Sequence, residues 1–588
     1  MINGSSIFMM LVGINMLVVG ILTWSYFSIK SQTASISHPQ EFLIRSNSNS
    51  PYRFHDPFIA YHLLDKLDTA SVLPKNTTNP KFYRRVFNGI ALNDNYCKEH
   101  RAHFANYPEV VFDHINLVSD FWTNHQLKLT SLKELHGVDV QPEISFNIIG
   151  KPENRKDAVL FKYPPSLDAN IYFFNNPFHS YRLIGKEFGC LSQVYNHIPG
   201  SVNMLRKDYV GNTIAEYTQQ YASKPQCFDN SKFFPQTYVL WKQDHCEEFF
   251  KYFNSPAYAE LKKERGVVFL RKISTGVHQG KGVFPLTEEA EQNLTKEYEN
   301  GALCGKNANT TVIQKLIHNP LLLEGRKFDF RVYMLVASTN PMISYFYDGY
   351  LRISLSEYDP NSKEKNTFVT NIVLNHDVFD IAEKNGTYKG MTKKEMEAKT
   401  CWWFDDLQKY LTEQGRITDP DWLNNHLRAQ MKKIMIHLTR MAELSYAKQS
   451  SLSELYGIDL MLDDNLDVWF IELNTMPLIA GWNPVTKKFF NNLMKDYFEI
   501  EYGLLRSRMK RVIDYINILT KEKSQWKVTG DGIEIKNFKA AQKEFEKVSM
   551  NYFEDEFKPS EKNGFQLIVD HNLQGPDRYA GHLLEECF

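Results

Sequence analysis

The chain has 588 residues, of which 43% are hydrophobic and 14% aromatic, and its formal net charge at pH 7 is −1. This length fits one catalytic region of two or three lobes with appendages, and this composition can bury a large core. The charge balance gives no overall attraction for nucleic acid, so we expect no nucleic-acid partner, and any basic docking surface must be local.

The first 29 residues contain no charged side chain. The apolar run from Ile7 to Ile29 is long enough to cross a bilayer, which takes roughly 20 residues. A cleaved signal peptide has a basic start and a shorter apolar core, whereas Trp24 and Tyr26 near the far end suit a membrane interface. We therefore expect residues 1–30 to form a transmembrane signal anchor that contacts the membrane through residues 7–29.

The basic residues near this run bear on its orientation. Lys30 and Arg45 follow it, and the positive-inside rule then places the C-terminal bulk in the cytosol. The sequence thus predicts a single-pass membrane protein with a cytosolic catalytic region. A lumenal or secreted chain is the alternative, because formal N-glycosylation triplets occur at Asn76, Asn293, Asn309 and Asn385, among others.

Seven cysteines are scattered along the chain without a CxxC pair. The pattern does not fit a structural zinc site, and the odd number argues against a complete disulfide framework. We expect reduced, mostly buried thiols.

The rest of the chain divides by composition and periodicity. Residues 31–51 are Ser-rich and predict a linker, and residues 52–154 form an N-terminal extension without an assigned role, with a helical stretch expected over 112–137. After that we expect short strands from about 155, a loop or surface helix over 286–300, strands over 312–350, helices over 401–449, a hairpin over 455–474, an amphipathic helix over 483–523 and a polar tail from 524.

The predicted hairpin carries oxygen-bearing side chains on one face. Its return strand ends in Glu472 and Asn474, which share a face because side chains alternate along a strand. Closing the hairpin brings Asp459 opposite Glu472, give or take one residue. Magnesium prefers oxygen ligands and takes one or two carboxylates plus substrate phosphates. We therefore predict a Mg-ATP site here, against the alternative of an ordinary hairpin with a solvated face.

A second strand, residues 327–336, carries a basic face. Lys327, Asp329 and Arg331 alternate with the apolar Phe328 and Phe330. Lysine and arginine on one face can hold phosphate oxygens, and arginine can do so with two hydrogen bonds.

A glycine-containing loop precedes this strand along the chain. Residues 276–282 place three glycines around His278 and Lys281, so that backbone N–H groups can approach an anion, and the strand before the loop offers Lys272. The loop could close over ATP. The segment from Val312 to Ile317 could offer backbone groups to an adenine edge.

These elements in this order resemble the tubulin–tyrosine-ligase-like family over about residues 155–500. The resemblance rests on NHIPGSVNMLRKD at 196–208, FFPQTYVL at 233–240, QGKGVF at 279–284, GRKFDFRVYMLV at 325–336 and ELYGIDLMLDDNLDVWFIELNTMP at 454–477. It implies an α/β (α+β) ATP-grasp ligase fold with N-terminal, central and C-terminal lobes, here preceded by the membrane-spanning helix. Residues 501–588 would then form a C-terminal helical and polar tail.

The resemblance also implies roles for the matched residues. The phosphates would be contacted by Lys207 and Lys272 and by Gly280, Lys281 and Gly282 of the loop, and adenine would be bound by Gln314, Lys315, Leu316 and Ile317. The strand residues that would face the nucleotide are Lys327, Asp329 and Arg331. Arg352 would lie near the transferred phosphate, and Asn371 would bind the cofactor. Asp459, Glu472 and Asn474 would hold magnesium, two ions in all. One position departs from the family: Phe368 stands where the family usually has His, which affects either activity or the choice of amino acid.

The implied reaction is ATP-dependent addition of glutamate to glutamate side chains of tubulin through an acyl phosphate, with Lys327, Arg331 and Arg352 stabilising the transferred phosphoryl group. Glycylation or tyrosine ligation is the runner-up within the family. The implied partners are free glutamate and tubulin or microtubules, including those of cilia. A basic helix face with Arg506, Arg508, Lys510 and Arg511 could dock acidic tails. Two further alternatives are a lumenal type II membrane transferase and a weakly active microtubule-binding module.

Overall fold

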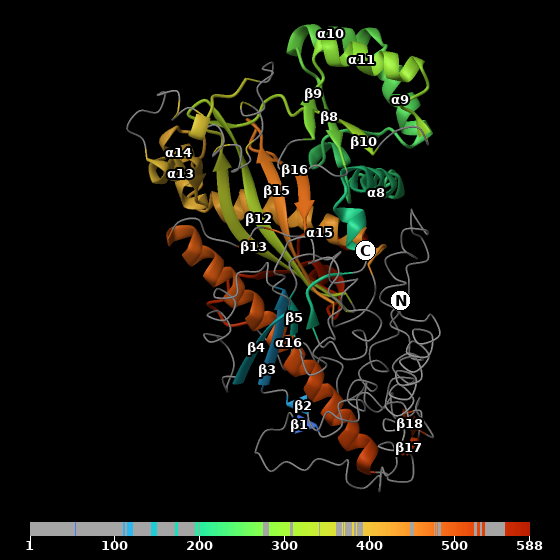
Figure 1. Cartoon of the computed structure of the whole chain (residues 1–588), viewed down its shortest axis with the longest axis vertical. Coiled ribbons are helices and arrows are strands. Elements are labelled where there is room, and N and C mark those ends of the chain that lie inside the picture. Colours follow the sequence, from blue (N-terminus) through green and yellow to red (C-terminus); the bar gives the residue numbers. More distant parts are fainter. Residues whose placement is uncertain are drawn as a thin grey trace, which may run out of the picture.

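The computed structural model describes only part of the chain. The described residues are 53–54, 110–111, 114–120, 143–149, 171–173, 194–198, 200–274, 282–305, 310–339, 341–359, 392–446, 452–475, 484–521, 526–529, 532–535 and 559–587, with a few single residues between these ranges. Their fold is mixed α/β with extensive antiparallel sheets (Figure 1).

A seven-stranded antiparallel sheet forms the centre of the described part. Its strands run in the order β14 (Cys401–Trp402), β13 (Met342–Ile353), β12 (Arg326–Thr339), β15 (Glu454–Leu462) and β16 (Val468–Asn474), while β11 (Leu322–Leu323) pairs with β12 and β19 (Gln566–Asp570) with β13. The expected strands over 312–350 and the expected hairpin over 455–474 are confirmed.

Helices cover one face of this sheet. They are α14 (Phe404–Glu413), the π-helical η7 (Leu423–Arg428) and α15 (Ala429–Glu443), as expected for a helical block over 401–449. Phe328, Phe330 and Val332 of β12 point into this interface and are fully buried, as their alternation with polar residues predicts.

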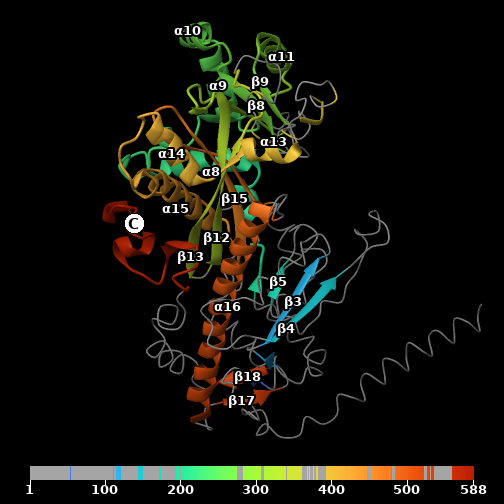
Figure 2. The ribbon, with the colours of Figure 1, turned by 90° about the vertical axis from the view of Figure 1, so that its left-hand side faces the viewer.

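The other face of the sheet meets α16 (Pro484–Lys521), the long helix expected over 483–523. Tyr333 of β12 is buried against Phe489 and Phe490 near the start of this helix. Figure 2 shows α16 continuing well past the end of the sheet.

A four-stranded antiparallel sheet forms a second lobe. Its strand order is β7 (Thr237–Val239), β10 (Thr311–Lys315), β8 (Phe269–Ile273) and β9 (Val283–Pro285), and its helices are α9 (Gln243–Phe253), α10 (Pro256–Arg265) and α11 (Glu288–Glu299). Phe269 and Ile313 pack with Phe249 and Phe250 of α9 in a separate core. The helix α11 occupies the segment expected to be a loop or surface helix.

The helix α8 (Lys207–Gln220) follows the short η3 (Ser201–Met204) and packs on β7, β10 and α15. A buried carboxylate fixes the turn before it: Glu454 of β15 accepts from the Ile198 amide at 2.7 Å and pairs with His197 Nδ1 at 2.8 Å. The strand that carries Asp459 therefore also anchors the segment that ends in Lys207.

The remaining elements are short. They are β1 (Arg53–Phe54), β2 (Val110–Val111), β3 (His114–Asp120), β4 (Glu143–Ile149), β5 (Ile171–Phe173), β6 (Val194–Tyr195), η4 (Asn230–Lys232), α13 (Lys393–Thr400), β17 (Trp526–Thr529), β18 (Gly532–Ile535), η8 (Gly575–Tyr579) and η9 (Glu585–Cys587). The helix expected over 112–137 is wrong at residues 114–120, where β3 pairs in parallel with β4 and β5. The run HINLVSD is short and only partly apolar, with two β-branched residues, and such runs are ambiguous between helix and strand until a partner strand pairs with them.

Two expectations from composition need correction. The structure has disulfides between Cys227 and Cys587 and between Cys246 and Cys304, and among the cysteines it describes only Cys401 is unpaired. The expectation of reduced thiols is therefore wrong for these four. The sequence gives no indication of these pairings, because the two bonded cysteines are 360 residues apart in one disulfide and 58 in the other.

The expected localisation, a single-pass membrane protein with a cytosolic catalytic region, is also corrected. Within the ranges given above, no helix combines the length and the apolar character needed to cross a membrane. The helix α16 is long enough at 38 residues, but charged residues such as Lys488, Lys495 and Glu499 recur along it. The predicted span, residues 7–29, lies outside the described residues.

Candidate functional site

The hairpin places the predicted magnesium ligands on one patch of sheet. Asp459 of β15 is directly opposite Glu472 of β16, as predicted, and Gly457 is opposite Asn474. The Nδ2 atom of Asn474 is buried without a hydrogen-bond partner among the described residues. A buried donor without a partner is uncommon in proteins, and an oxygen of a bound ligand could accept from it.

The basic strand faces the same patch from β12. Arg331 is paired with Asp459 across the strands, and its guanidinium donates to both carboxylate oxygens, at 2.6 and 3.1 Å. Asp329, also on β12, is opposite Arg352 of the next strand, β13, and accepts two hydrogen bonds of 2.7 Å from its guanidinium. Arg352 also reaches Asp459 at 2.9 Å. The two arginines and two aspartates form one continuous network.

Burial makes this network electrostatically strong. Burial alone would raise the pKa of Asp459, but Arg331 and Arg352 outweigh it and hold the pKa at about 2. Thr370 donates from its hydroxyl to Asp329. Thr370 was not predicted as a site residue, although it precedes the predicted Asn371 in the sequence.

Two glycines allow the close approach of Arg331. A Cβ atom on Gly457 would lie 2.9 Å from Pro477 Cβ and 3.2 Å from the Arg331 side chain, and a Cβ on Gly349 would lie 1.6 Å from the Arg331 carbonyl oxygen. The ladder between β12 and β13 is irregular between Arg331 and Tyr333, next to Gly349. Both glycines lie inside strands that the sequence predicts, and a glycine in such a position indicates a bulge or a close approach of another group to the backbone.

A pocket separates the hairpin from the four-stranded sheet. It encloses about 450 Å³, part of it open to solvent, and its lining includes Lys207, Lys272, Gln314 and Glu472. Lys272 of β8 and Gln314 of β10 face the pocket, whereas their neighbours Phe269 and Ile313 face the core of α9 and α11, because the side chains alternate. Four predicted residues from four different elements therefore meet here.

The lysines in and near the pocket interact with polar partners. Lys207 Nζ lies 3.3 Å from a Glu472 oxygen, and Lys272 donates to the Gln314 side chain, which in turn donates to Thr237 at 2.9 Å. Burial, and then the charge of Lys207, lowers the pKa of Lys272 to about 8. Burial also lowers the pKa of Lys327 on β12 to about 8.

The predicted residues carry an excess of positive charge. The five basic side chains Lys207, Lys272, Lys327, Arg331 and Arg352 face three acidic ones, Asp329, Asp459 and Glu472. Burial is the largest cause of the lowered pKa values of Lys272 and Lys327, and at Lys272 the charges of Lys207 and Lys327 lower the pKa further, which reflects the local excess of positive charge. An anionic ligand such as a polyphosphate would balance it.

The predicted adenine segment lies at the end of β10. The Lys315 amide donates to the Gln236 carbonyl at 2.8 Å and the Leu316 amide to the Val268 carbonyl at 2.9 Å. Both N–H groups are thus engaged in protein hydrogen bonds. An adenine ring held by residues 314–317, Ile317 included, would use the other groups of this segment.

Some predicted residues fall in gaps of the described part. Gly280, Lys281, Phe368 and Asn371 lie outside the described residues. Gly282, at the end of the glycine loop, is described, and its carbonyl accepts from the Ile273 amide at 2.9 Å.

The donor set suits magnesium. Among the described residues no three His, Cys, Asp or Glu side chains gather as a metal site. Asp459, Glu472 and Asn474 offer two carboxylates and an amide oxygen, which are hard ligands, and magnesium commonly takes only one or two carboxylates beside substrate phosphates. A metal ion would compete with Arg331 and Arg352 for Asp459 and with Lys207 for Glu472.

One positioning contact was missed by sequence reasoning. The side chain of Asp208, next to Lys207, accepts from Arg206 and from the Trp241 indole N–H at 3.1 Å, and its amide donates to Ser274 Oγ at 3.0 Å. Ser274 leads into the glycine loop. The start of α8 and the start of the loop are therefore tied together.

Comparison with known proteins agrees with this geometry. A family model described as tubulin-tyrosine ligase family matches residues 186–511. The human protein named inactive polyglycylase TTLL10 is 31% identical over 328 residues, covering 53% of this chain and 45% of that protein. The macaque (Macaca fascicularis) protein polyglycylase TTLL10 is 30% identical, covering 48% and 44%, and the mouse tubulin polyglutamylase TTLL5 is 26% identical, covering 53% and 21%. The matched part is less than half of each of these relatives.

Proposed function

The chain belongs to the tubulin-tyrosine ligase family, and from this premise we propose that it is an ATP-dependent ligase that joins a free amino acid to side-chain carboxylates of an acidic polypeptide. We propose an ATP-grasp arrangement over about residues 155–500, and glutamate as the amino acid. Tubulin tails are the first acceptor to test, because a relative is named a tubulin polyglutamylase.

The observation that carries the proposal is the convergence of basic and oxygen-bearing side chains at one pocket. Lys207 and Lys272 face Glu472 across it, and the Arg331–Asp459–Arg352 network lies on the adjoining strands. In this proposal the lysines hold the phosphates of ATP, residues 314–317 hold adenine, and Asp459, Glu472 and Asn474 hold two magnesium ions. When bound, magnesium would neutralise negative charge on the phosphates during transfer.

The chemistry follows from the need to activate a carboxylate. An acceptor carboxylate oxygen attacks the γ-phosphorus of ATP, the bond to ADP breaks, and an acyl phosphate forms. The amine of the incoming amino acid then attacks the acyl carbon, phosphate leaves, and the amine loses a proton. Arg331 and Arg352 are preorganised by their carboxylate partners, so they can stabilise charge on the transferred group without reorganising.

Glycine is the second candidate amino acid. Relatives from several mammals are named polyglycylases, and one of these names carries the word inactive. The choice between glutamate and glycine, and the extent of activity, are therefore direct outcomes of the assay.

The test incubates the full chain with ATP, magnesium, tubulin and, separately, labelled glutamate, glycine or tyrosine. We expect glutamate to be incorporated and the Glu472→Gln variant to be inactive, while Glu413→Gln, a change at an exposed glutamate, keeps activity. Incorporation of none of the three, or equal incorporation by Glu472→Gln, would defeat the ligase proposal.

A further inference from the structure

Two disulfides lie deep in the described part of the chain. Cys227 and Cys587 are 2% and 3% exposed, and Cys246 is fully buried in the core of the four-stranded lobe, where it is bonded to Cys304. The two bonds lie in different lobes and close loops of 360 and 58 residues. The two disulfides are therefore independent evidence that cysteines of this chain are oxidised.

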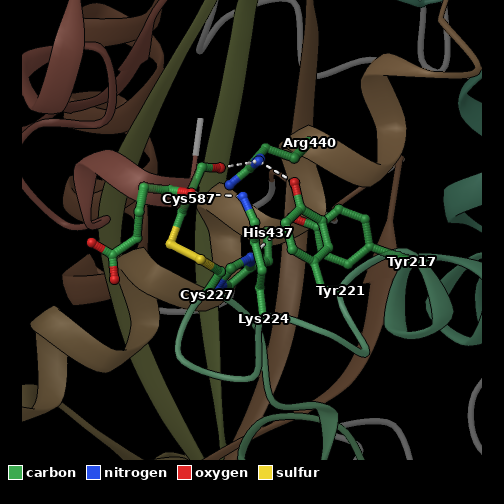
Figure 3. Close-up of a disulfide and its surroundings, with 8 residues drawn as sticks. Tyr217, Tyr221, Lys224, Cys227, His437, Arg440 and Cys587 are labelled. Carbon is green, nitrogen blue, oxygen red and sulfur yellow. Dashed lines mark hydrogen bonds between the residues drawn. A yellow bond between two sulfur atoms is a disulfide. The ribbon is translucent and has the colours of Figure 1, made fainter.

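The Cys227–Cys587 bond is embedded in a polar frame (Figure 3). Arg440 of α15 donates to the Cys587 carbonyl at 2.7 Å and also to the Tyr221 hydroxyl, and Lys224 donates to the Glu586 carbonyl at 3.1 Å. These contacts hold residues 586–587 against α15 and the turn after α8. The disulfide belongs to the packed structure of the protein.

Neither bond resembles an exchanging, catalytic disulfide. Exchange needs an accessible thiolate that attacks one of the sulfurs, and three of the four bonded cysteines are buried. Cys401 is the remaining cysteine in the described ranges, and burial raises the pKa of its thiol to about 12, so it stays protonated. Largely buried disulfides with no thiolate among the described residues are structural.

Structural disulfides point to the compartment in which a domain folds. Each bond forms when two thiols lose two protons and two electrons, and the electrons pass to an oxidised dithiol–disulfide oxidoreductase, which becomes its dithiol form. Such oxidants act in the secretory lumen and outside the cell, whereas cytosolic glutathione and thioredoxin keep thiols reduced. A domain with two buried disulfides thus fits an oxidising compartment.

One glycosylation triplet is compatible with the same compartment. Asn293 is exposed on α11, while Leu294 of the triplet is buried and Thr295 donates to the Glu291 carbonyl. The exposed Asn293 lies on the lobe that also contains the Cys246–Cys304 bond.

We infer that this ligase domain folds and acts in an oxidising compartment, and that its acceptor is an acidic polypeptide exposed to that compartment. The acceptor part rests on the proposed ligase function, whereas the compartment part rests on the disulfides alone. If the acceptor test labels tubulin, a cytosolic polypeptide, instead, the acceptor part of the inference is wrong.

The first experiment measures the redox state of the full chain in eukaryotic cells. Thiols are blocked with N-ethylmaleimide at lysis, and peptides are analysed by mass spectrometry without reduction. We expect Cys227–Cys587 and Cys246–Cys304 linked peptides from most of the population, unchanged in the Cys401→Ser control. Reduction of the purified chain should lower its Tm by roughly 4–12 °C. Recovery of all four cysteines as blocked thiols would overturn the inference.

The second experiment locates the acceptor. Vesicles and cytosol are prepared from the same cells. The permeabilised vesicles and the cytosol are incubated separately with the full chain, ATP and labelled glutamate or glycine. A parallel sample of sealed vesicles is treated with protease to identify the polypeptides that the vesicle membrane protects. We expect label in protected polypeptides, and a glycosidase-sensitive mass shift of the chain that Asn293→Gln removes. Label confined to cytosolic tubulin would overturn the acceptor class while supporting the ligase function. Label in neither fraction, with both disulfides formed, would overturn the ligase function and leave the compartment supported.

Discussion

Arg352 lies between two buried carboxylates, Asp329 and Asp459, and holds both. Like charges this close would repel each other strongly in a buried site without the guanidinium. The arginine thus has a structural role that precedes any role toward phosphate. At the scale of single residues, the candidate site is an array of charges that stabilise one another.

We predict that Arg352→Met lowers the free energy of unfolding by about 3–5 kcal/mol, because it leaves the buried Asp329 without its arginine and removes one of the two arginine partners of Asp459. Urea denaturation measures this change. The matched control is Arg416→Met, which breaks an exposed pair with Asp464 and should cost at most about 1 kcal/mol. Equal costs for the two variants would contradict the buried network.

The depressed pKa values of Lys272 and Lys327 predict that ATP binding takes up protons in mildly alkaline solution. Both pKa values are about 8 in the folded protein, against about 10.4 for free lysine. Between these values the unfolded chain holds more protons, so these two groups make the protein without ligand more stable as pH rises through this window. A bound polyphosphate favours the charged lysines and raises their pKa values.

Calorimetry at pH 8.5 in two buffers of different ionisation enthalpy measures this uptake. We expect a buffer-dependent binding enthalpy for the unmodified chain and a smaller dependence for Lys272→Met. An exposed lysine, Lys409, provides the control substitution to Met, which should leave the dependence unchanged. A binding enthalpy that is the same in both buffers would refute the prediction.

At the scale of elements, the β12–β13 ladder depends on a glycine. Gly349 lies where the register shifts beside Arg331, and a Cβ atom there would collide with the Arg331 carbonyl. The strand pair could not keep this spacing with any other residue. The position of the basic strand is therefore set by its neighbour as well as by its own sequence.

We predict that Gly349→Ala costs more than about 3 kcal/mol in unfolding free energy, above the usual range for overpacking, because the obstructing atom is backbone. Gly415→Ala is the comparison: its φ is +67° and no atom lies within 4 Å, so only the strain of the left-handed backbone, about 1–2 kcal/mol, is expected. Chemical denaturation of both variants gives the difference. A cost for Gly349→Ala no greater than for Gly415→Ala would contradict the close approach.

At the scale of the whole molecule, residues 559–587 complete the central core. The strand β19 pairs with β13, and Ile568, Val569, Tyr579 and Leu583 join the same cluster as β12 and α15. The boundary predicted near residue 500 stays a prediction, but these residues pack as part of the sheet. The Cys227–Cys587 bond lies at the end of the same segment.

We predict that Ile568→Ala destabilises the protein by about 2–4 kcal/mol, as expected for a fully buried aliphatic side chain. Gln566→Ala on the same strand is exposed and should change stability by less than about 0.5 kcal/mol. Thermal and urea unfolding measure both. An Ile568→Ala variant as stable as Gln566→Ala would show that the segment does not contribute to the core.

The sequence by itself determined the elements whose side chains alternate clearly. The hairpin, its Asp459–Glu472 pairing to within one residue, and the buried face of β12 follow from the alternation of side chains along a strand, and the structure then fixed the register. The order of five motifs determined the family. These features are local, or depend on order along the chain, so they can be read without coordinates.

Only the tertiary structure decided the features that depend on distant partners. Arg352 and Asp459 meet across three strands, Cys227 finds Cys587 360 residues later, and HINLVSD becomes a strand because β4 and β5 pair with it. The physical reason is shared: a charge, a thiol or a short apolar run has several acceptable partners. Only packing selects among them, and in this chain it places the charges, the Cys227–Cys587 bond and the C-terminal strand around one central sheet.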